Sequence, residues 1–255
     1  MSTDAPKAAL ITGASGRIGA AMARGLAGAG TAVVIHVNRS RDEGDALAAT
    51  IRAAGGTAEV LQADLLDADA ARQVPAEAAA TLGRPLDLLV NNASIFEDDG
   101  PGDIDVERLR AHLDIHVSAP LLLSDGFAAQ AGEGDGLIVN MIDQRVWRLT
   151  PRFVSYTASK TALWTLTRTL AQALAPKLRV NAIGPGPSLK NARQSTADFQ
   201  AQIDALPLQR GPALEDFAAT ILYLWRMKSM TGQMIALDGG QHLAWQTPDV
   251  AAIVE

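Results

Sequence analysis

The stretch K-A-A-L-I-T-G-A-S-G-R-I-G, from Lys7 to Gly19, decides the fold of this 255-residue chain. Its first five residues form a short apolar run that predicts a buried strand, and the alanine-rich stretch after Gly19 predicts a helix. Between them, glycines let backbone approach a phosphate, and the helix start offers free N–H groups and positive potential. The segment therefore predicts a site for the pyrophosphate of a dinucleotide; the alternative is an ordinary turn before a helix.

Polar or glycine-rich segments follow four further apolar runs. Ligands bind at the carboxyl ends of strands in open parallel α/β sheets, so these segments are candidates for the same site. They are N-N-A-S (91–94) after the strand expected at 86–91, Asp143 after 136–142, G-P-G-P-S (184–188) after 178–183, and D-G-G (238–240) after 233–237.

Strands and helices alternate along the whole chain without a linker-like break. Strands are also expected at 31–37 and 57–62, and helices at 17–29, 41–54, 67–82, 105–131, 152–175 and 213–227. This pattern predicts an α/β protein with one domain over residues 1–255, a doubly wound parallel sheet of about seven strands with helices on both faces. The stretch 185–207, rich in Pro, Ser, Asn and Gln, is expected to form a mobile substrate lid.

Composition narrows the function classes. The net charge of −6 argues against nucleic acid as a partner, and 48% hydrophobic residues suffice for a core. No long uncharged apolar stretch and no basic, apolar leader are present, so neither a membrane span nor a signal peptide is expected. The absence of cysteine excludes disulfides and thiolate ligands and fits a cytoplasmic protein. We expect no metal site.

Tyr156 and Lys160 stand four residues apart in Y-T-A-S-K. In a helix this spacing places the phenol and the ammonium on one face. The positive charge favours the phenolate and is expected to lower the pKa of Tyr156, which would let it exchange protons with a substrate near neutral pH.

Taken together and in this order, T-G-x-x-x-x-x-G, N-N-A-S, Y-x-x-x-K and P-G resemble the short-chain dehydrogenase/reductase family over nearly the whole chain. The resemblance implies a single-domain Rossmann fold that binds NAD(P)(H) and transfers hydride, with Tyr156 and Lys160 as catalytic residues. It implies cofactor contacts at Gly13, Ser15, Arg17, Ile18, Gly19, His36, Asn38, Leu65, Asn92, Ala93, Ser94, Tyr156, Lys160, Pro185, Gly186 and Ser188.

The turn after the second strand indicates which cofactor is used. NAD enzymes of this fold usually hold the ribose 2′-hydroxyl with an acidic residue there, but the sequence reads Asn38-Arg39-Ser40-Arg41. Arg39 can pair with a 2′-phosphate and Ser40 can donate to it, which favours NADPH. The alternative is that both arginines are solvated residues opening a helix. Asp64 matches the family residue that contacts adenine; alternatively, it caps the next helix.

Four positions depart from the family pattern. Arg17 replaces the middle glycine of the first turn, where it either lies close to the substrate or only neutralises cofactor phosphate. Asp143 replaces the serine found thirteen residues before the tyrosine; the alternative is a structural Asp that caps the following loop. An ionised carboxylate only accepts hydrogen bonds, so Asp143 should repel a carbonyl oxygen, attract N–H groups and oppose a phenolate, which favours reduction. His116 replaces the helix asparagine and either relays protons or is a buried neutral histidine. Phe96 can stack on a flat heteroaromatic substrate or simply pack within its loop.

These departures coincide in one branch of the family. Arg17, H-x-x-R-S from His36 to Ser40, N-A-S-x-F and the spacing of Asp143 and Tyr156 are similar to pteridine reductases, and I-H-V-S-A-P around His116 is similar to the dihydromonapterin reductase type. The resemblance implies a pterin between the nicotinamide and Phe96, in contact with Arg17, Ser94, Asp143 and Tyr156. Tyr156, assisted by Asp143 and Lys160, would supply the proton.

Two alternatives stay open: a carbonyl or 3-oxoacyl reductase of the same family, and a non-catalytic regulator that binds NADPH. The apolar faces of the helices at 105–131 and 152–175, which include Trp164 and Leu170, suggest a homodimer or homotetramer. The tail, with Gln241, His242, Leu243 and Trp245, is expected to pack, for example on a neighbouring subunit.

Overall fold

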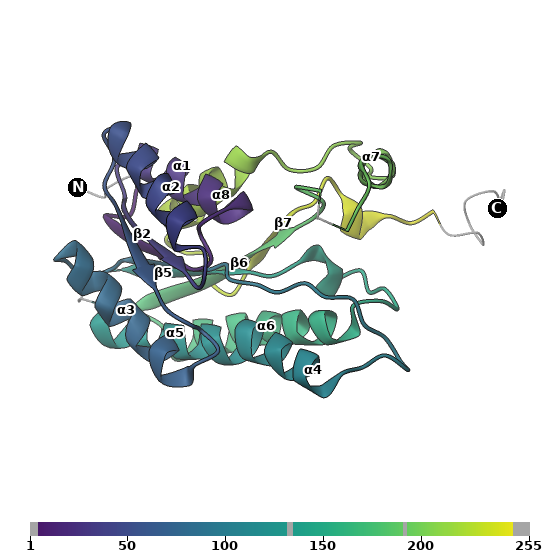
Figure 1. Cartoon of the computed structure of the whole chain (residues 1–255), viewed down its shortest axis with the longest axis horizontal. Helices are drawn as coiled ribbons and strands as arrows, with labels where there is room; N and C mark the ends of the chain where they lie inside the picture. The colour runs from purple at the N-terminus through teal and green to yellow at the C-terminus, as the bar shows by residue number, and fades with distance from the viewer. Residues whose placement is uncertain (1–4, 132–134, 191–192, 247–255) are drawn as a thin grey trace.

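The structure is a computed structural model that describes residues 5–131, 135–190 and 193–246. Over these residues, seven parallel strands form one sheet in the order β3-β2-β1-β4-β5-β6-β7 (Figure 1). The predicted doubly wound parallel sheet is therefore confirmed. The strands are β1 (Ala8–Ile11), β2 (Ala32–Val37), β3 (Ala58–Gln62), β4 (Leu88–Asn91), β5 (Gly136–Met141), β6 (Leu178–Pro185) and β7 (Met234–Leu237).

Helices cover both faces of the sheet. Figure 1 shows α1, α2 and α8 on one face and α3, α4, α5 and α6 on the other, while α7 lies beyond the carboxyl end of the sheet. The helices are α1 (Arg17–Gly28), α2 (Arg41–Ala53), α3 (Ala68–Leu82), α4 (Val106–Leu113), α5 (Ala119–Gln130), α6 (Val154–Ala173), α7 (Thr196–Asp204) and α8 (Leu214–Arg226); shorter turns are η1 (Asp114–Ser118), η2 (Gln144–Val146) and η3 (Gln241–Leu243).

Strand β1 shows how the sheet divides the core. Successive side chains of a strand point to opposite faces. Ala9 and Ile11 pack in the core beneath α1 and α8, while Ala8 and Leu10 pack in the core beneath α3 and α5, and all four are completely buried. Because both faces are covered, the strand is an uninterrupted apolar run, which is the pattern from which it was predictable.

Helices α3 and α5 lie in close contact at Gly126. A Cβ atom added there would lie 2.2 Å from the backbone carbonyl oxygen of Arg72. We expect Gly126→Ala to lower the free energy of unfolding by about 1–3 kcal/mol because the two helices would have to separate. Gly28→Ala is the matched control, since nothing lies within 4 Å of a Cβ at the last residue of α1. Urea unfolding of both variants checks this, and equal stabilities would contradict it.

Two predictions about elements need correction. The single helix expected at 105–131 is divided into α4, a π-helical turn (η1) and α5. A π turn contains an extra residue, which apolar periodicity does not reveal. The expected helices also did not include α7, which lies within 185–207 and whose start is capped by the Ser195 hydroxyl oxygen accepting from the Asp198 N–H at 3.0 Å. The role of this stretch as a substrate lid stays a prediction. Residues 191–192 of this stretch lie outside the described residues.

The remaining expectations about surfaces concern the described residues only. Leu243 and Trp245 are each 64% exposed in the single chain, whereas the His242 ring lies against Trp147 with the centroids 5.2 Å apart. The expected packing of the tail is therefore found only in part among the described residues. Among the described helices, none is both long and apolar enough to cross a membrane. Oligomer formation stays a prediction.

Candidate active site

A cleft of about 950 Å³ opens at the carboxyl ends of the strands. Nearly all of the residues predicted for the site line it. From the first half of the chain these are Gly13, Ser15, Arg17, Ile18, Gly19, His36, Asn38, Arg39, Ser40, Leu65, Asn92, Ala93, Ser94 and Phe96; from the second half they are Asp143, Tyr156, Lys160, Pro185, Gly186 and Ser188. Asp64 and His116 do not line it.

The glycine-rich turn is tied to β4 by hydrogen bonds. The Asn92 amide donates to the carbonyl oxygens of Thr12 at 2.8 Å and Gly13 at 3.0 Å, and the Thr12 hydroxyl oxygen accepts from the Asn92 and Ala93 N–H groups. Gly13 has a φ of +60°, and a Cβ there would lie 2.8 Å from the Ala93 Cα. Only glycine fits this turn, which keeps bare backbone at the cleft wall.

Arg17 occupies the left-handed region with a φ of +54°, which costs a residue with a side chain about 1–2 kcal/mol. This conformation explains why the family has glycine at this position. The Arg17 guanidinium lies 3.3 Å from the Leu189 carbonyl oxygen and 3.5 Å from that of Lys190. It therefore bridges the cleft between the glycine-rich turn and the segment after β6.

His36 holds the glycine-rich turn in place through hydrogen bonds to backbone. Its Nδ1 accepts from the Gly13 N–H at 3.2 Å, so Nε2 carries the proton and donates to the Ala63 carbonyl oxygen at 3.2 Å. Burial lowers the pKa of His36 to about 4, which keeps the ring neutral. Both ring nitrogens are occupied by backbone, so His36 contributes shape to the cleft and holds the turn in place.

The neighbouring Asp64 does not face the cleft. Its carboxylate accepts from the Asn38 amide at 3.2 Å and from the Leu66 N–H at 3.1 Å. The alternative role as a cap of the next helix is wrong, because the cap of α3 is Asp67, whose carboxylate accepts from the Asp69 and Ala70 N–H groups. The contact of Asp64 with adenine stays a prediction.

Asp143 and Tyr156 form a buried pair. The Tyr156 hydroxyl donates to Asp143 Oδ2 at 2.9 Å, and Asp143 Oδ1 accepts from the Arg145 N–H at 2.8 Å. Burial raises the pKa of Asp143. Burial, together with the negative charge of Asp143, raises the pKa of Tyr156 well above its ordinary value. The expected lowering of the Tyr156 pKa by Lys160 is therefore wrong, and the phenol keeps its proton at neutral pH.

Lys160 lies beside this pair on the same face of α6. Its ammonium donates to the Met141 carbonyl oxygen at 2.8 Å and is 5.7 Å from the Tyr156 ring centroid. Burial lowers the pKa of Lys160 to about 8. The charged group is thus held at an energetic cost next to the cleft, where it can bind a polar ligand.

Lys160→Met is expected to raise the free energy of unfolding at pH 7 by about 1–3 kcal/mol, because it removes a buried charge. Between pH 8 and 10.5 the folded wild type has lost this proton while the unfolded chain still holds it, so wild-type stability rises with pH in that window. The advantage of the variant should therefore shrink over that window. Urea unfolding at several pH values checks this, with the exposed Lys177→Met as control; an advantage that does not change with pH would contradict it.

His116 lies directly behind the cleft on the π-helical turn η1. It is completely buried, with Nδ1 2.8 Å from the Ser159 Oγ and Nε2 2.8 Å from the Ser94 Oγ. Burial lowers its pKa strongly, with further lowering by Lys160 and His112. His116 is therefore a buried neutral histidine, as one of the two alternatives held, although its partners are two serines rather than a carbonyl group.

Phe96 already has an aromatic partner. Its ring stacks on Phe153 with centroids 4.3 Å apart and an interplanar angle of 4°, and its edge meets Tyr156 at 4.7 Å. Phe153 begins α6 with a φ of +58°, a left-handed conformation unusual for an aromatic residue. The structure therefore shows Phe96 packed against aromatic side chains of the protein, which was the alternative to stacking on a substrate.

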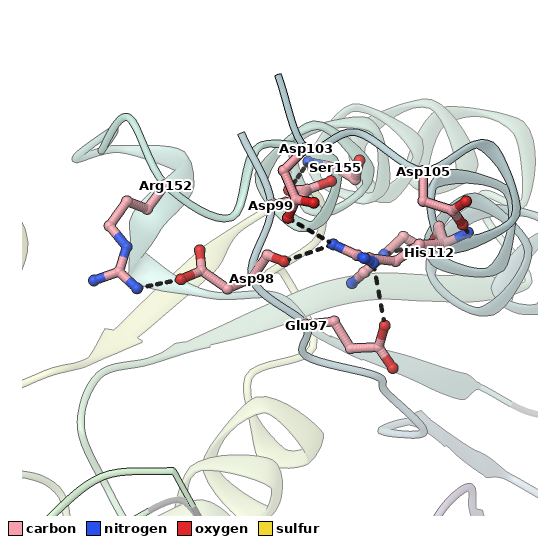
Figure 2. Close-up of polar contacts among 9 residues, drawn as sticks. Glu97, Asp98, Asp99, Asp103, Asp105, His112, Arg152 and Ser155 are labelled. Carbon is pink, nitrogen blue, oxygen red and sulfur yellow. Dashed lines mark hydrogen bonds and ion pairs between the residues drawn. The ribbon is translucent and has the colours of Figure 1, made fainter. Parts of the chain in front are cut away.

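Residues 97–105 form the second part of the connection from β4 to α4, and they make polar contacts with α4 and with the start of α6 (Figure 2). The Arg108 guanidinium donates to the Asp98 carbonyl oxygen at 2.9 Å and lies 3.6 Å from Glu97. Asp99 Oδ1 accepts from the Ser155 N–H at 3.0 Å. Burial acts to raise the pKa of Asp99, but hydrogen bonds from Ser155 help to hold that pKa below its usual value. Asp99 thereby caps the start of α6, which has no side-chain cap of its own, and helps to position Tyr156.

Sequence reasoning missed several residues that line the cleft: Gln144, Arg145, Arg193, Phe199, Gln202 and Gln241. Arg145 lies 5.2 Å from the Phe153 ring centroid and 6.0 Å from that of Phe96. Its place two residues after Asp143 was a usable signal, because the same strand end carries both. Arg193 donates to the Phe96 carbonyl oxygen at 2.6 Å, a contact between segments 97 residues apart that no local pattern indicates.

Comparisons with known proteins agree with this geometry. The model of the short chain dehydrogenase family matches residues 7–201. A crystal structure of FolM alternative dihydrofolate reductase 1 from Brucella canis complexed with NADP superimposes with a TM-score of 0.94 at 50% identity, covering 98% of this chain and 99% of that one.

Two curated relatives with named activities show what this chain is similar to. The dihydromonapterin reductase of Klebsiella pneumoniae is 32% identical over 95% of this chain and 100% of its own length. The 3-oxoacyl-[acyl-carrier-protein] reductase of Synechocystis is 32% identical over 91% of this chain and 95% of its own length.

Proposed function

The chain belongs to the short-chain dehydrogenase family, and we propose that it is an NADPH-dependent reductase of pteridine-like substrates such as dihydropterins. The observation that carries the proposal is the pair formed by Asp143 and Tyr156. A buried carboxylate stands where the family has a serine, and it accepts a hydrogen bond from the Tyr156 hydroxyl at 2.9 Å. A carboxylate suits the N–H and NH₂ groups of a pterin and repels a ketone oxygen.

Bound NADPH would supply the hydride for reduction of a C=N bond. Tyr156 holds the proton that the ring nitrogen requires, and its raised pKa keeps that proton available at neutral pH. Asp143 orients the phenol and accepts from the substrate. Lys160 would bind the nicotinamide ribose, and Ser188 with the turn at 185–186 would hold the carboxamide.

The relatives support this reading without deciding the substrate. The Klebsiella relative and the Brucella structure carry names that refer to dihydromonapterin or dihydrofolate reduction, and the Brucella structure contains NADP. The second candidate, a 3-oxoacyl reductase, is favoured by the Synechocystis relative. The Asp143 carboxylate argues against it, because a ketone oxygen needs a hydrogen-bond donor.

A substrate panel tests the proposal. The wild-type protein is mixed with NADPH and with dihydrobiopterin, dihydromonapterin, dihydrofolate or 3-oxoacyl thioesters, and the absorbance of reduced nicotinamide is followed. Turnover of a dihydropterin at a kcat/KM well above that of any ketone is expected. Turnover of ketones alone would overturn the pteridine assignment, and cofactor binding without turnover of any substrate would indicate a regulator.

Arg39→Ala is expected to weaken NADPH binding by about tenfold to hundredfold and to leave NADH binding unchanged, because it removes a charged partner of the 2′-phosphate. Arg41→Ala is the matched control: Arg41 pairs with Asp45 at 2.9 Å and does not line the cleft, whereas Arg39 does. Titration of cofactor fluorescence measures both. Equal losses for the two cofactors would show that Arg39 does not contact the 2′-phosphate.

A further inference from the structure

A line of hydrogen bonds runs from the core of α6 to the cleft. It begins at the Tyr156 carbonyl oxygen, 2.7 Å from the Ser159 Oγ, and continues through His116 to the Ser94 Oγ, with 2.8 Å at each ring nitrogen. Ser159 and His116 are completely buried, whereas Ser94 lines the cleft. The direction of the protons along this line determines what Ser94 offers to a ligand.

The imidazole in the middle has one N–H and one lone pair. The positive charge of Lys160 nearby disfavours a second proton on this ring. The pKa of His116 is accordingly lowered, mainly by burial. A neutral ring can donate at one nitrogen only, so it must accept at the other.

The shorter contacts select one direction. Ser159 has a single hydroxyl proton, and the Tyr156 carbonyl oxygen at 2.7 Å takes it, so the Ser159 oxygen accepts from the His116 Nδ1–H. The His116 Nε2 then carries a lone pair, which accepts the Ser94 proton at 2.8 Å. The reverse direction would give up the 2.7 Å contact and would aim the Ser94 hydroxyl at the Ile95 carbonyl oxygen, which is farther away at 3.2 Å.

We propose that His116 is a positioning residue that draws the Ser94 hydroxyl proton away from the cleft, so that Ser94 presents only lone pairs to the substrate. The ligand group facing Ser94 is then a donor, an N–H or NH₂. Together with the Asp143 carboxylate, the cleft would offer two acceptors, which suits an amino-substituted heteroaromatic ring. This inference rests on the proposed function for the identity of the substrate, but the direction of the line can be measured without it.

The first test reads the tautomer of His116. In protein labelled with ¹⁵N-histidine, the signals of the four histidines are separated, and the His116 signal is identified by its loss in His116→Gln. A protonated Nδ1 with an unprotonated Nε2 is expected. A protonated Nε2 would overturn the proposal, whatever substrate the enzyme uses.

The second test asks whether His116 acts through Ser94. An asparagine side chain at position 116 ends about where Nδ1 lies, so its amide cannot reach Ser94. A glutamine side chain extends to about the position of Nε2, where its amide oxygen can accept the hydrogen bond from the Ser94 hydroxyl. With NADPH saturating, His116→Asn and Ser94→Ala should each raise KM for the pterin by about fivefold to tenfold with little change in kcat, and His116→Gln should restore most of the loss. If His116 acts only through Ser94, the double variant with His116→Asn and Ser94→Ala should have a KM no higher than that of Ser94→Ala alone.

The outcomes separate this proposal from the proposed function. Additive losses in the double variant, or no change of KM in Ser94→Ala, would overturn the role of His116 even in a genuine pterin reductase. If only ketones are turned over, the pteridine assignment fails, while the tautomer still reports the direction. In that case Ser94→Ala should leave KM for the ketone unchanged or lower, and a raised KM would show that Ser94 donates.

Discussion

Tyr156→Phe is expected to lower kcat by about 10²–10⁴-fold, because it removes a single oxygen that carries the transferred proton. The ring remains, so its edge contact with Phe96 and its place in α6 are kept. The Asp143 carboxylate loses the 2.9 Å hydrogen bond but still accepts from the Arg145 N–H. The affinity for NADPH should change little, and stopped-flow measurement of hydride transfer separates the chemical step from binding.

The chain provides a matched control for this substitution. Tyr223 is the other of its two tyrosines; it is 44% exposed on α8 and does not line the cleft. Tyr223→Phe should therefore keep wild-type kcat and KM. If Tyr156→Phe kept more than about a tenth of wild-type kcat, Tyr156 would not be the principal general acid, whose loss usually costs at least about 10²-fold.

Asp143→Ser is expected to lower kcat/KM for a dihydropterin by about 10²-fold or more. The substitution removes a buried charge-assisted acceptor and leaves the substrate N–H groups unpaired, a large penalty in a dry site. It also replaces an acceptor by a hydroxyl that can donate to a carbonyl oxygen. Activity on 3-oxo substrates should therefore stay the same or improve, and the ratio of the two activities is the measured quantity.

Asp143→Asn separates shape from charge. The amide is nearly isosteric and its oxygen can accept from either Tyr156 or the Arg145 N–H, but it carries no negative charge. If the charge matters, the pH profile of kcat should shift toward lower pH, because the Tyr156 pKa is raised partly by Asp143. A pterin kcat/KM that is unchanged in both variants would show that Asp143 only caps the turn at η2.

The sheet and the position of the cleft could be predicted from the sequence, because parallel strands that are buried on both faces appear in a sequence as uninterrupted apolar runs. The residues at their carboxyl ends, such as Asn92, Asp143 and Gly186, necessarily meet at one edge of such a sheet. That argument requires only the order of the elements, and it needs no knowledge of individual side-chain conformations.

The details that depend on burial or distant contacts could not be predicted in this way. The sequence places Lys160 near Tyr156, but it does not show that burial and Asp143 outweigh the ammonium and raise the phenol pKa. It does not show the π turn that brings His116 to Ser94, since one extra residue in a helix leaves apolar spacing almost unchanged. Nor does it show that Asp99 caps a helix that begins 55 residues later in the chain, at Val154.

The stacked pair of Phe96 and Phe153 bears on which ligands the cleft can hold. One face of the Phe96 ring lies parallel to the Phe153 ring with the centroids 4.3 Å apart, while Phe96 lines the cleft and Phe153 does not. A flat substrate would therefore stack on the other face of Phe96, without displacing Phe153. Because the stack fixes the plane of the Phe96 ring, the surface offered to a ligand is rigid and flat, which favours a large flat molecule over a small or aliphatic one.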